Sequence, residues 1–139
     1  DVQEQKITSH RSHFLRSMEP SDMEELIRIG ITDDYTMGYA DVAGFRLGTA
    51  RCVRWINPYS KKVTDLVLHP LIAMDNTMIS SNYMGLGDDE IVKYVCKLID
   101  ASRGGNPSIL WHNHIMCCTN GQKVVYGKII DYISKGTIK

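Results

Sequence analysis

The chain has 139 residues, of which 43% are hydrophobic and 23% are charged, and its 16 basic residues balance 16 acidic ones. A balanced charge without a basic stripe argues against a nucleic-acid partner. No apolar run approaches the roughly 20 residues of a membrane span, so we expect no membrane partner either. We expect residues 1–139 to form a single domain or the carboxyl-terminal part of one. Seven methionines and free thiols indicate a reducing compartment, so we expect the cytoplasm.

The first half of the chain predicts strands and one helix. Ile7–Arg16 predicts a strand with a polar loop at its end. Glu19–Gly30 predicts a helix, because acidic residues crowd its first turn, apolar residues recur at helical spacing and a glycine ends it. Ile31–Thr49 predicts a short strand and then a glycine-rich loop. Val53–Ile56 and Val63–Leu68 predict the two arms of a β-hairpin.

The second half predicts two helices with a short buried strand between them. Met78–Gly85 reads as a connector, and Gly87–Gly105 predicts a helix with acidic residues at its start and two glycines at its end. Ser108–His112 predicts the strand, and Gly121–Gly136 predicts the last helix. This alternation of strands and helices predicts an α/β fold with parallel strand pairing.

Four polar segments could contribute to a functional site, and each also has an ordinary structural interpretation as a turn or a solvated strand end. These segments are residues 10–16, 33–41, 44–49 and 111–114. His112 and His114 would share one face if the last strand continued through them. They would lie at the carboxyl end of a strand, where α/β proteins place their active sites. No nucleotide-binding, zinc-protease or serine-hydrolase motif is present.

Taken in order, these segments resemble the polysaccharide deacetylase family (NodB-homology domains), in particular a bacterial branch of it. The matching segments are RSHFLR at 11–16, GITDDYTMGYAD at 30–41, GFRLGT at 44–49, LVLHPLIAMDNTM at 66–78 and ILWHN at 109–113. The resemblance covers roughly Ile7–Ile133, and its specificity comes from the order of the motifs.

The resemblance implies a partial (β/α) barrel of the polysaccharide deacetylase type with an inserted β-hairpin. It implies a hydrolase that removes acetyl groups from N-acetylated sugars with a divalent metal, often zinc. His112 would be the catalytic acid, and Arg11 would help to orient the catalytic base. The residues implied to bind the carbohydrate substrate are Arg46, Asp34, His13 and Trp111.

The departures from the family indicate that the chain is one part of such a domain. The family's early T-F-D-D and H-[ST]-x-x-H motifs do not precede Ile7, so we assign no metal ligand here and expect the chain alone to be inactive. A complete barrel takes about 250 residues. We therefore expect an amino-terminal half or a second copy as a partner. Cys52 stands where the branch has a proline, and His114 where it has a small polar residue.

Two other functions stay open. The first is a non-catalytic carbohydrate-binding domain that uses exposed aromatic residues, for which the candidates are Trp55, Tyr59, Tyr83 and Trp111. The second is a small metalloprotein in which His112 and His114 bind a metal. Its third ligand would be a carboxylate, Asp34 or Asp75, and an open position would remain for catalysis.

Overall fold

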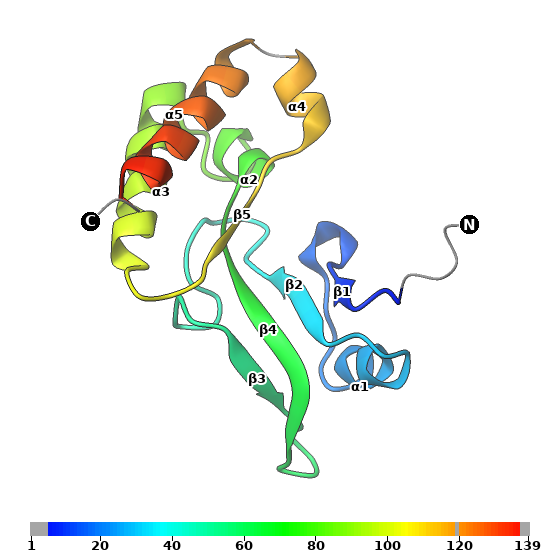
Figure 1. The fold of residues 1–139 in the computed structure, drawn as a ribbon. Helices are drawn as coiled ribbons and strands as arrows, with labels where there is room; N and C mark the ends of the chain where they lie inside the picture. The colour runs from blue at the N-terminus through cyan, green and yellow to red at the C-terminus, as the bar shows by residue number, and fades with distance from the viewer. Residues whose placement is uncertain (1–5, 119, 137–139) are drawn as a thin grey trace.

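The computed structural model describes residues 6–118 and 120–136 of the chain (Figure 1). Its first elements are β1 (Ser9–His10), the 3-10 turn η2 (His13–Leu15), α1 (Ser21–Arg28), β2 (Asp33–Met37), β3 (Val53–Ile56) and β4 (Val63–Met74). They are followed by α2 (Asp75–Ile79), α3 (Asp88–Ala101), β5 (Ser108–Leu110), α4 (Asn113–Cys118) and α5 (Asn120–Gly136).

The parallel strands lie side by side in the order in which they occur in the chain. β1 pairs with β2, β2 with β4, and β4 with β5, all in parallel. β3 is antiparallel to β4 and forms the predicted hairpin with it. In (β/α) barrels successive parallel strands are added on one side of the sheet in chain order, whereas in doubly wound sheets the strand order reverses at one point. The fold is therefore mixed α/β, with a curled sheet that forms half of a barrel, as the α/β prediction required.

Two hydrophobic cores attach the helices to the sheet. The residues of the first, beneath α1, include Met23, Leu26, Trp55, Leu66 and Leu68. The residues of the second, between β4, α3 and α5, include Ile72, Ile91, Val95, Val125 and Ile129. Burying each leucine, isoleucine, valine or methionine side chain of these cores contributes roughly 1.5–3 kcal/mol. The cores thus hold the helices against the strands that lead to the polar residues.

Within Ile7–Arg16, predicted as a strand with a loop at its end, the strand covers only Ser9–His10. The ladder stops because the N–H of Ser12 donates to the side-chain hydroxyl of Thr36 in β2, at 2.9 Å, and not to a backbone carbonyl. The chain then turns through η2, where Phe14 has φ 59° and Leu15 has φ 54°. Such left-handed backbone is uncommon for bulky residues and cannot continue a strand.

The last strand also ends earlier than predicted, at Leu110 and not at His112. The backbone N–H of His112 donates to Asp75 Oδ2 at 2.5 Å, which takes it out of the ladder. The carbonyl of His112 then accepts the N–H of Met116 at 3.2 Å and starts α4, a helix that the sequence did not predict. α2 begins before the predicted connector and overlaps its first two residues. β4 extends beyond the predicted hairpin arm, past Leu68 to Met74.

The elements with the strongest patterns lie where they were predicted. α1, α3 and α5 fall within the predicted helical ranges or within one residue of them, and β3 matches its predicted arm. Gly30 ends the α1 segment with φ 90°, a conformation that glycine adopts without strain. Among the described residues, no helix is both long enough and apolar enough to cross a membrane.

Candidate functional site

Polar side chains follow the carboxyl ends of three parallel strands. Arg11 and His13 come directly after β1, Asp75 follows β4, and His112 follows β5. In α/β proteins of this winding, the loops at the carboxyl ends of the strands build the active site. This edge of the sheet is therefore the candidate site.

Asp75 and His112 form a hydrogen-bonded pair where β4 and β5 end. The side chain of Asp75 is completely buried, and its Oδ1 lies 2.6 Å from His112 Nδ1. Oδ2 accepts the backbone N–H of His112, and Oδ1 also accepts the N–H of Asn76 at 2.6 Å. A buried charge is stable only when such donors replace water. These contacts hold both the imidazole and its backbone against one carboxylate.

The pair leaves one ring nitrogen of His112 available. An ionised carboxylate only accepts hydrogen bonds, so Nδ1 carries the proton that faces Asp75. Nε2 hydrogen-bonds to no residue that the structure describes, and 35% of the His112 side chain is exposed. His114 lies on α4 and not on the strand face predicted for it, because β5 has already ended. The two rings are still neighbours, with centroids 5.4 Å apart.

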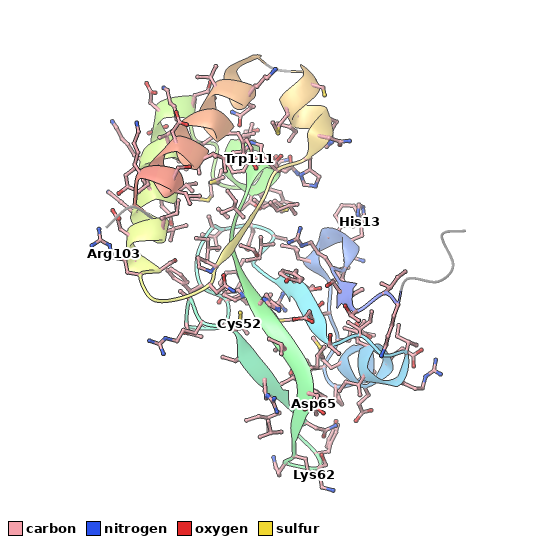
Figure 2. All side chains as sticks on the ribbon, viewed as in Figure 1. His13, Cys52, Lys62, Asp65, Arg103 and Trp111 are labelled. Atoms are coloured by element: carbon pink, nitrogen blue, oxygen red, sulfur yellow. The ribbon has the colours of Figure 1, made fainter. Side chains whose placement is uncertain are left out.

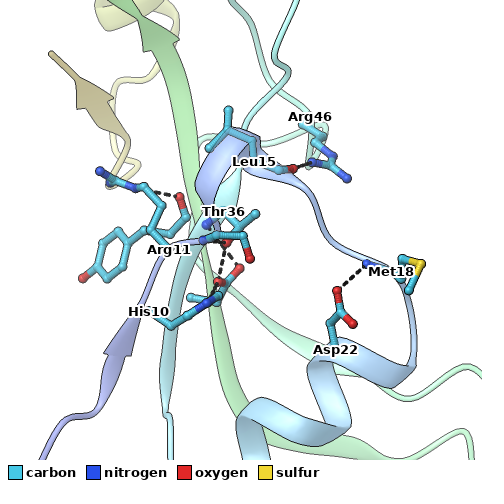
Figure 3. Close-up of polar contacts among 10 residues, drawn as sticks. His10, Arg11, Leu15, Met18, Asp22, Thr36 and Arg46 are labelled. Atoms are coloured by element: carbon cyan, nitrogen blue, oxygen red, sulfur yellow. Dashed lines mark hydrogen bonds and ion pairs between the residues drawn. The ribbon is translucent and has the colours of Figure 1, made fainter. Parts of the chain in front are cut away.

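A second polar cluster ties the end of β1 to β2, as Figure 3 shows. Asp34 Oδ1 lies 2.9 Å from His10 Nδ1 and accepts the Thr36 hydroxyl at 2.6 Å. Asp34 Oδ2 accepts the N–H of Thr36 at 3.2 Å. Asp34, predicted to line the carbohydrate groove, is completely buried within this network. Its contacts position the strand end that carries Arg11.

Arg11 lines a shallow groove, widely open to solvent, together with Ser9, His10 and Tyr35. Its Nε donates to the carbonyl of Tyr35 at 3.1 Å, and the guanidinium carbon lies 5.7 Å from the centre of the Tyr35 ring. Partial burial lowers the pKa of Arg11 from its ordinary value, and the charge of Asp34 opposes that shift. An arginine stays protonated at neutral pH under such a shift, so this groove has a cationic wall.

Arg46 and His13 lie at the turn beyond this groove. Arg46 Nη1 donates to the carbonyls of Leu15, at 3.3 Å, and Gly38, at 3.1 Å. It thereby joins η2 to the end of β2 (Figure 3). His13 is exposed and projects from η2 away from the strands (Figure 2). Arg46 is thus a brace for the loops of the site, and His13 is available at its rim.

The aromatic residues do not form one binding platform. Trp111 is half-buried and packs on Tyr126 of α5, with ring centroids 5.6 Å apart. Trp55 is 3% exposed and belongs to the other core, beneath α1. Tyr59 and Tyr83 are exposed, in the hairpin turn and between α2 and α3. Because Trp55 and Trp111 lie in separate cores, the four rings cannot stack along one sugar chain.

The residues of this chain do not assemble a metal site in the described part of the structure. No three or more His, Cys, Asp or Glu side chains converge there as ligands would. His112 Nδ1 already faces Asp75, which accepts hydrogen bonds through both of its oxygens. The ligand set His112, His114 and Asp75 or Asp34 does not fit this geometry, since Asp34 is buried with His10.

Sequence reasoning missed several partners of the polar residues. It considered Asp75 only as a metal ligand and not as the residue that holds His112. It did not single out His69, whose Nε2 lies 2.7 Å from Asp33 Oδ1, or the contact between His69 and Cys52. The sequence offered one signal, the predicted parallel pairing of strands. Where two parallel strands are neighbours, as β4 and β5 are, the residues that follow them come close together.

Comparisons with known proteins leave the function to be argued from this geometry. No protein-family model, no curated protein and no solved structure matches the chain.

Proposed function

We propose that this chain is the carboxyl-terminal part of a polysaccharide-deacetylase-like hydrolase that removes acetyl groups from N-acetylated sugars. The observation that carries the proposal is the pair formed by Asp75 and His112 at the carboxyl ends of neighbouring parallel strands. A histidine held through one nitrogen, with the other unbonded and accessible, is the arrangement that general acid–base catalysis requires.

His112 would supply the proton that amide hydrolysis needs. When water adds to the acetyl carbonyl, the C–N bond breaks only as the sugar amine receives a proton, since an amide anion is a poor leaving group. His112 Nε2 would donate that proton, while Asp75 holds Nδ1 and stabilises the protonated ring. Asp75 is therefore a positioning residue, and His112 is the residue that would touch substrate.

Arg11 and the groove beside it would contribute the second part of the site. The Nε of Arg11 is fixed on the carbonyl of Tyr35, so the guanidinium has a defined place at the end of β1. Its remaining N–H groups match a carboxylate or sugar oxygens. Arg11 would orient a catalytic carboxylate, while Arg46 keeps the surrounding loops in place.

A divalent metal would polarise the acetyl carbonyl in a deacetylase of this kind. The described residues of this chain do not fit the ligand set of such an ion. We therefore assign no metal ligand to them and place the metal-binding residues in the longer parent protein.

The test is acetate release from an N-acetylated chito-oligosaccharide by the full-length protein that contains this chain. We expect His112→Asn to lower kcat by roughly 10²–10⁴-fold, the usual contribution of a positioned acid or base. Asp75→Asn should also lower kcat, with KM changed much less, because it acts through His112. His114→Asn is the matched control and should leave kcat within about twofold.

Two results would overturn the proposal. The first is wild-type kcat in the His112→Asn variant. The second is the absence of acetate release by the intact parent protein, with zinc supplied and with the fold verified by circular dichroism. Equal losses in the His112→Asn and His114→Asn variants would favour a metal site built on both histidines.

A further inference from the structure

Cys52, His69 and Asp33 form a line of polar contacts across three neighbouring strands. The antiparallel register of β3 and β4 places Cys52, which precedes β3, opposite His69. The parallel register of β2 and β4 pairs Asp33 with Val67, two residues before His69 and therefore on the same face of the sheet. In Figure 2 the labelled Cys52 lies beside β4. This cluster is separate from the pair at Asp75.

The contacts connect the Cys52 thiol, a candidate nucleophile, to the His69 imidazole, a base, and then to the Asp33 carboxylate. Cys52 Sγ lies 3.2 Å from His69 Nδ1, and His69 Nε2 lies 2.7 Å from Asp33 Oδ1. An ionised carboxylate only accepts hydrogen bonds, so the ring proton is on Nε2, and this N–H donates a hydrogen bond to Asp33. In the neutral ring Nδ1 is then unprotonated, and it accepts the hydrogen bond of the Cys52 thiol. This is the arrangement of an activated nucleophile.

Two further contacts keep the imidazole in place. Tyr35 stacks on His69, with ring centroids 4.1 Å apart and an interplanar angle of 15°. Hydrogen bonds from Thr32 and from His69 lower the pKa of the Asp33 carboxyl, so that it remains an acceptor at neutral pH. Cys52 is half-buried, the side chain of His69 is 12% exposed and that of Asp33 is 33% exposed, so the cluster is not sealed from solvent.

Cys96 provides a comparison within the same chain. Cys52 and Cys96 are both half-buried. Burial, and then the charge of Asp100, raise the pKa of the Cys96 thiol. Cys96 should therefore be a weak nucleophile, because only the thiolate form attacks. Because both thiols are half-buried but have different neighbours, Cys96 is the reference for Cys52.

We propose that Cys52 is a nucleophilic thiol that forms a reversible mixed disulfide with low-molecular-weight disulfides, with His69 as its proton acceptor. The thiol proton moves to His69 Nδ1, and the Cys52 sulfur attacks one sulfur of the disulfide. A bond forms between these two sulfurs as the original S–S bond breaks. The departing thiolate takes the proton from His69. The disulfide is the oxidant, so the exchange balances without another reactant.

The first test compares the alkylation rate of each cysteine in the folded and in the denatured chain. Iodoacetamide is used at neutral pH, and cleavage at acidic residues separates the peptides of Cys52 and Cys96 for mass spectrometry. A free cysteine is only a few per cent thiolate at neutral pH, so an activated one can react roughly tenfold faster. We expect Cys52 to react roughly tenfold faster when folded, and Cys96 to react more slowly when folded.

Two variants assign the effect to the cluster. His69→Gln removes the proton acceptor and should abolish the rate advantage of Cys52, and Asp33→Asn should reduce it. Folding is checked by circular dichroism. The comparison of folded and denatured wild-type chain stands even if a variant fails to fold. A Cys52 that reacts more slowly when folded, or a folded His69→Gln chain with the wild-type rate, would overturn the proposal.

The second test uses oxidised glutathione as the disulfide. We expect one glutathione adduct on the wild-type chain, located at Cys52, removed by dithiothreitol and absent from the Cys52→Ser variant. Adducts on the other cysteines with none on Cys52 would contradict the proposal.

Discussion

Asp75 is the residue whose environment most constrains the candidate site. Its carboxylate is completely buried, and all of its hydrogen-bond partners are backbone or imidazole N–H groups. An amide at this position would bring an NH₂ group against one of these donors. Removing an acceptor from buried donors costs roughly 1–3 kcal/mol, and more when the acceptor is charged.

We therefore expect Asp75→Asn to lower the free energy of unfolding by roughly 2 kcal/mol, measured by urea denaturation. Asp89→Asn is the matched control, because the Asp89 side chain is exposed on α3 and forms a surface ion pair with Lys128. That variant should stay within about 0.5 kcal/mol of wild type. Equal losses in the two variants would mean that the buried contacts of Asp75 do not stabilise the fold.

The partners of the polar residues were beyond the reach of sequence patterns. Asp75 and His112 are 37 residues apart, and Asp33 and His69 are 36 apart. Local spacing predicts which side chains share an element, whereas these contacts depend on which strands become neighbours. The sequence indicated His112 because it follows a short apolar run. It did not indicate His69, because the predicted strand ended at Leu68, whereas β4 continues through His69 to Met74.

At the scale of elements, the loop before β5 depends on a close approach between backbones. Gly105 lies so near to Ala50 that an added Cβ would be 2.7 Å from the Ala50 carbonyl carbon. The next residue, Asn106, donates its N–H to the Ala50 carbonyl at 2.8 Å. This contact sets where β5 begins, and through it the position of His112.

We expect Gly105→Ala to destabilise the chain by roughly 1–3 kcal/mol, the usual cost of forcing an extra carbon into packed structure. Gly127→Ala provides the same substitution in open space on α5, where nothing lies within 4 Å of the added carbon. It should stabilise by up to about 1 kcal/mol, because alanine is the better helix former. Thermal unfolding of both variants measures the contrast. A neutral Gly105→Ala would show that the loop can move aside.

Helices could be predicted from the sequence where the periodic spacing of apolar residues extends over two or more turns. α1, α3 and α5 have apolar residues at helical spacing over two or more turns, and β3 lies beside a clear turn segment. α2 has five residues and α4 has six, which is too short for periodicity to register. α2 begins at Asp75, whose Oδ1 accepts the N–H of the next residue, and α4 begins directly after His112, whose N–H donates to Asp75 Oδ2.

At the scale of the whole molecule, the sheet has an open edge. Among the described strands, β1 pairs only with β2. The carbonyl of Thr8 accepts N–H groups from the β2 side, so the N–H of Ser9 faces outward. An unpaired strand edge is a template for another chain. The half-barrel should therefore associate with a second molecule along this edge.

We expect the apparent mass of the isolated chain, measured by light scattering, to rise with concentration above that of one chain. Ser9→Pro removes one outward donor without disturbing the β2 ladder, and it should weaken this association. A constant mass equal to one chain, over the same concentration range, would count against an open half-barrel.

β4 links the two polar clusters mechanically. It is the only described strand that pairs with three others. It carries His69 of the Cys52 cluster in its middle, and Asp75, the partner of His112, directly follows it. A slip of β4 by one residue would pull His69 away from Asp33 and Cys52, and would pull Asp75 away from His112. The contacts of both clusters therefore depend on the register of the same strand.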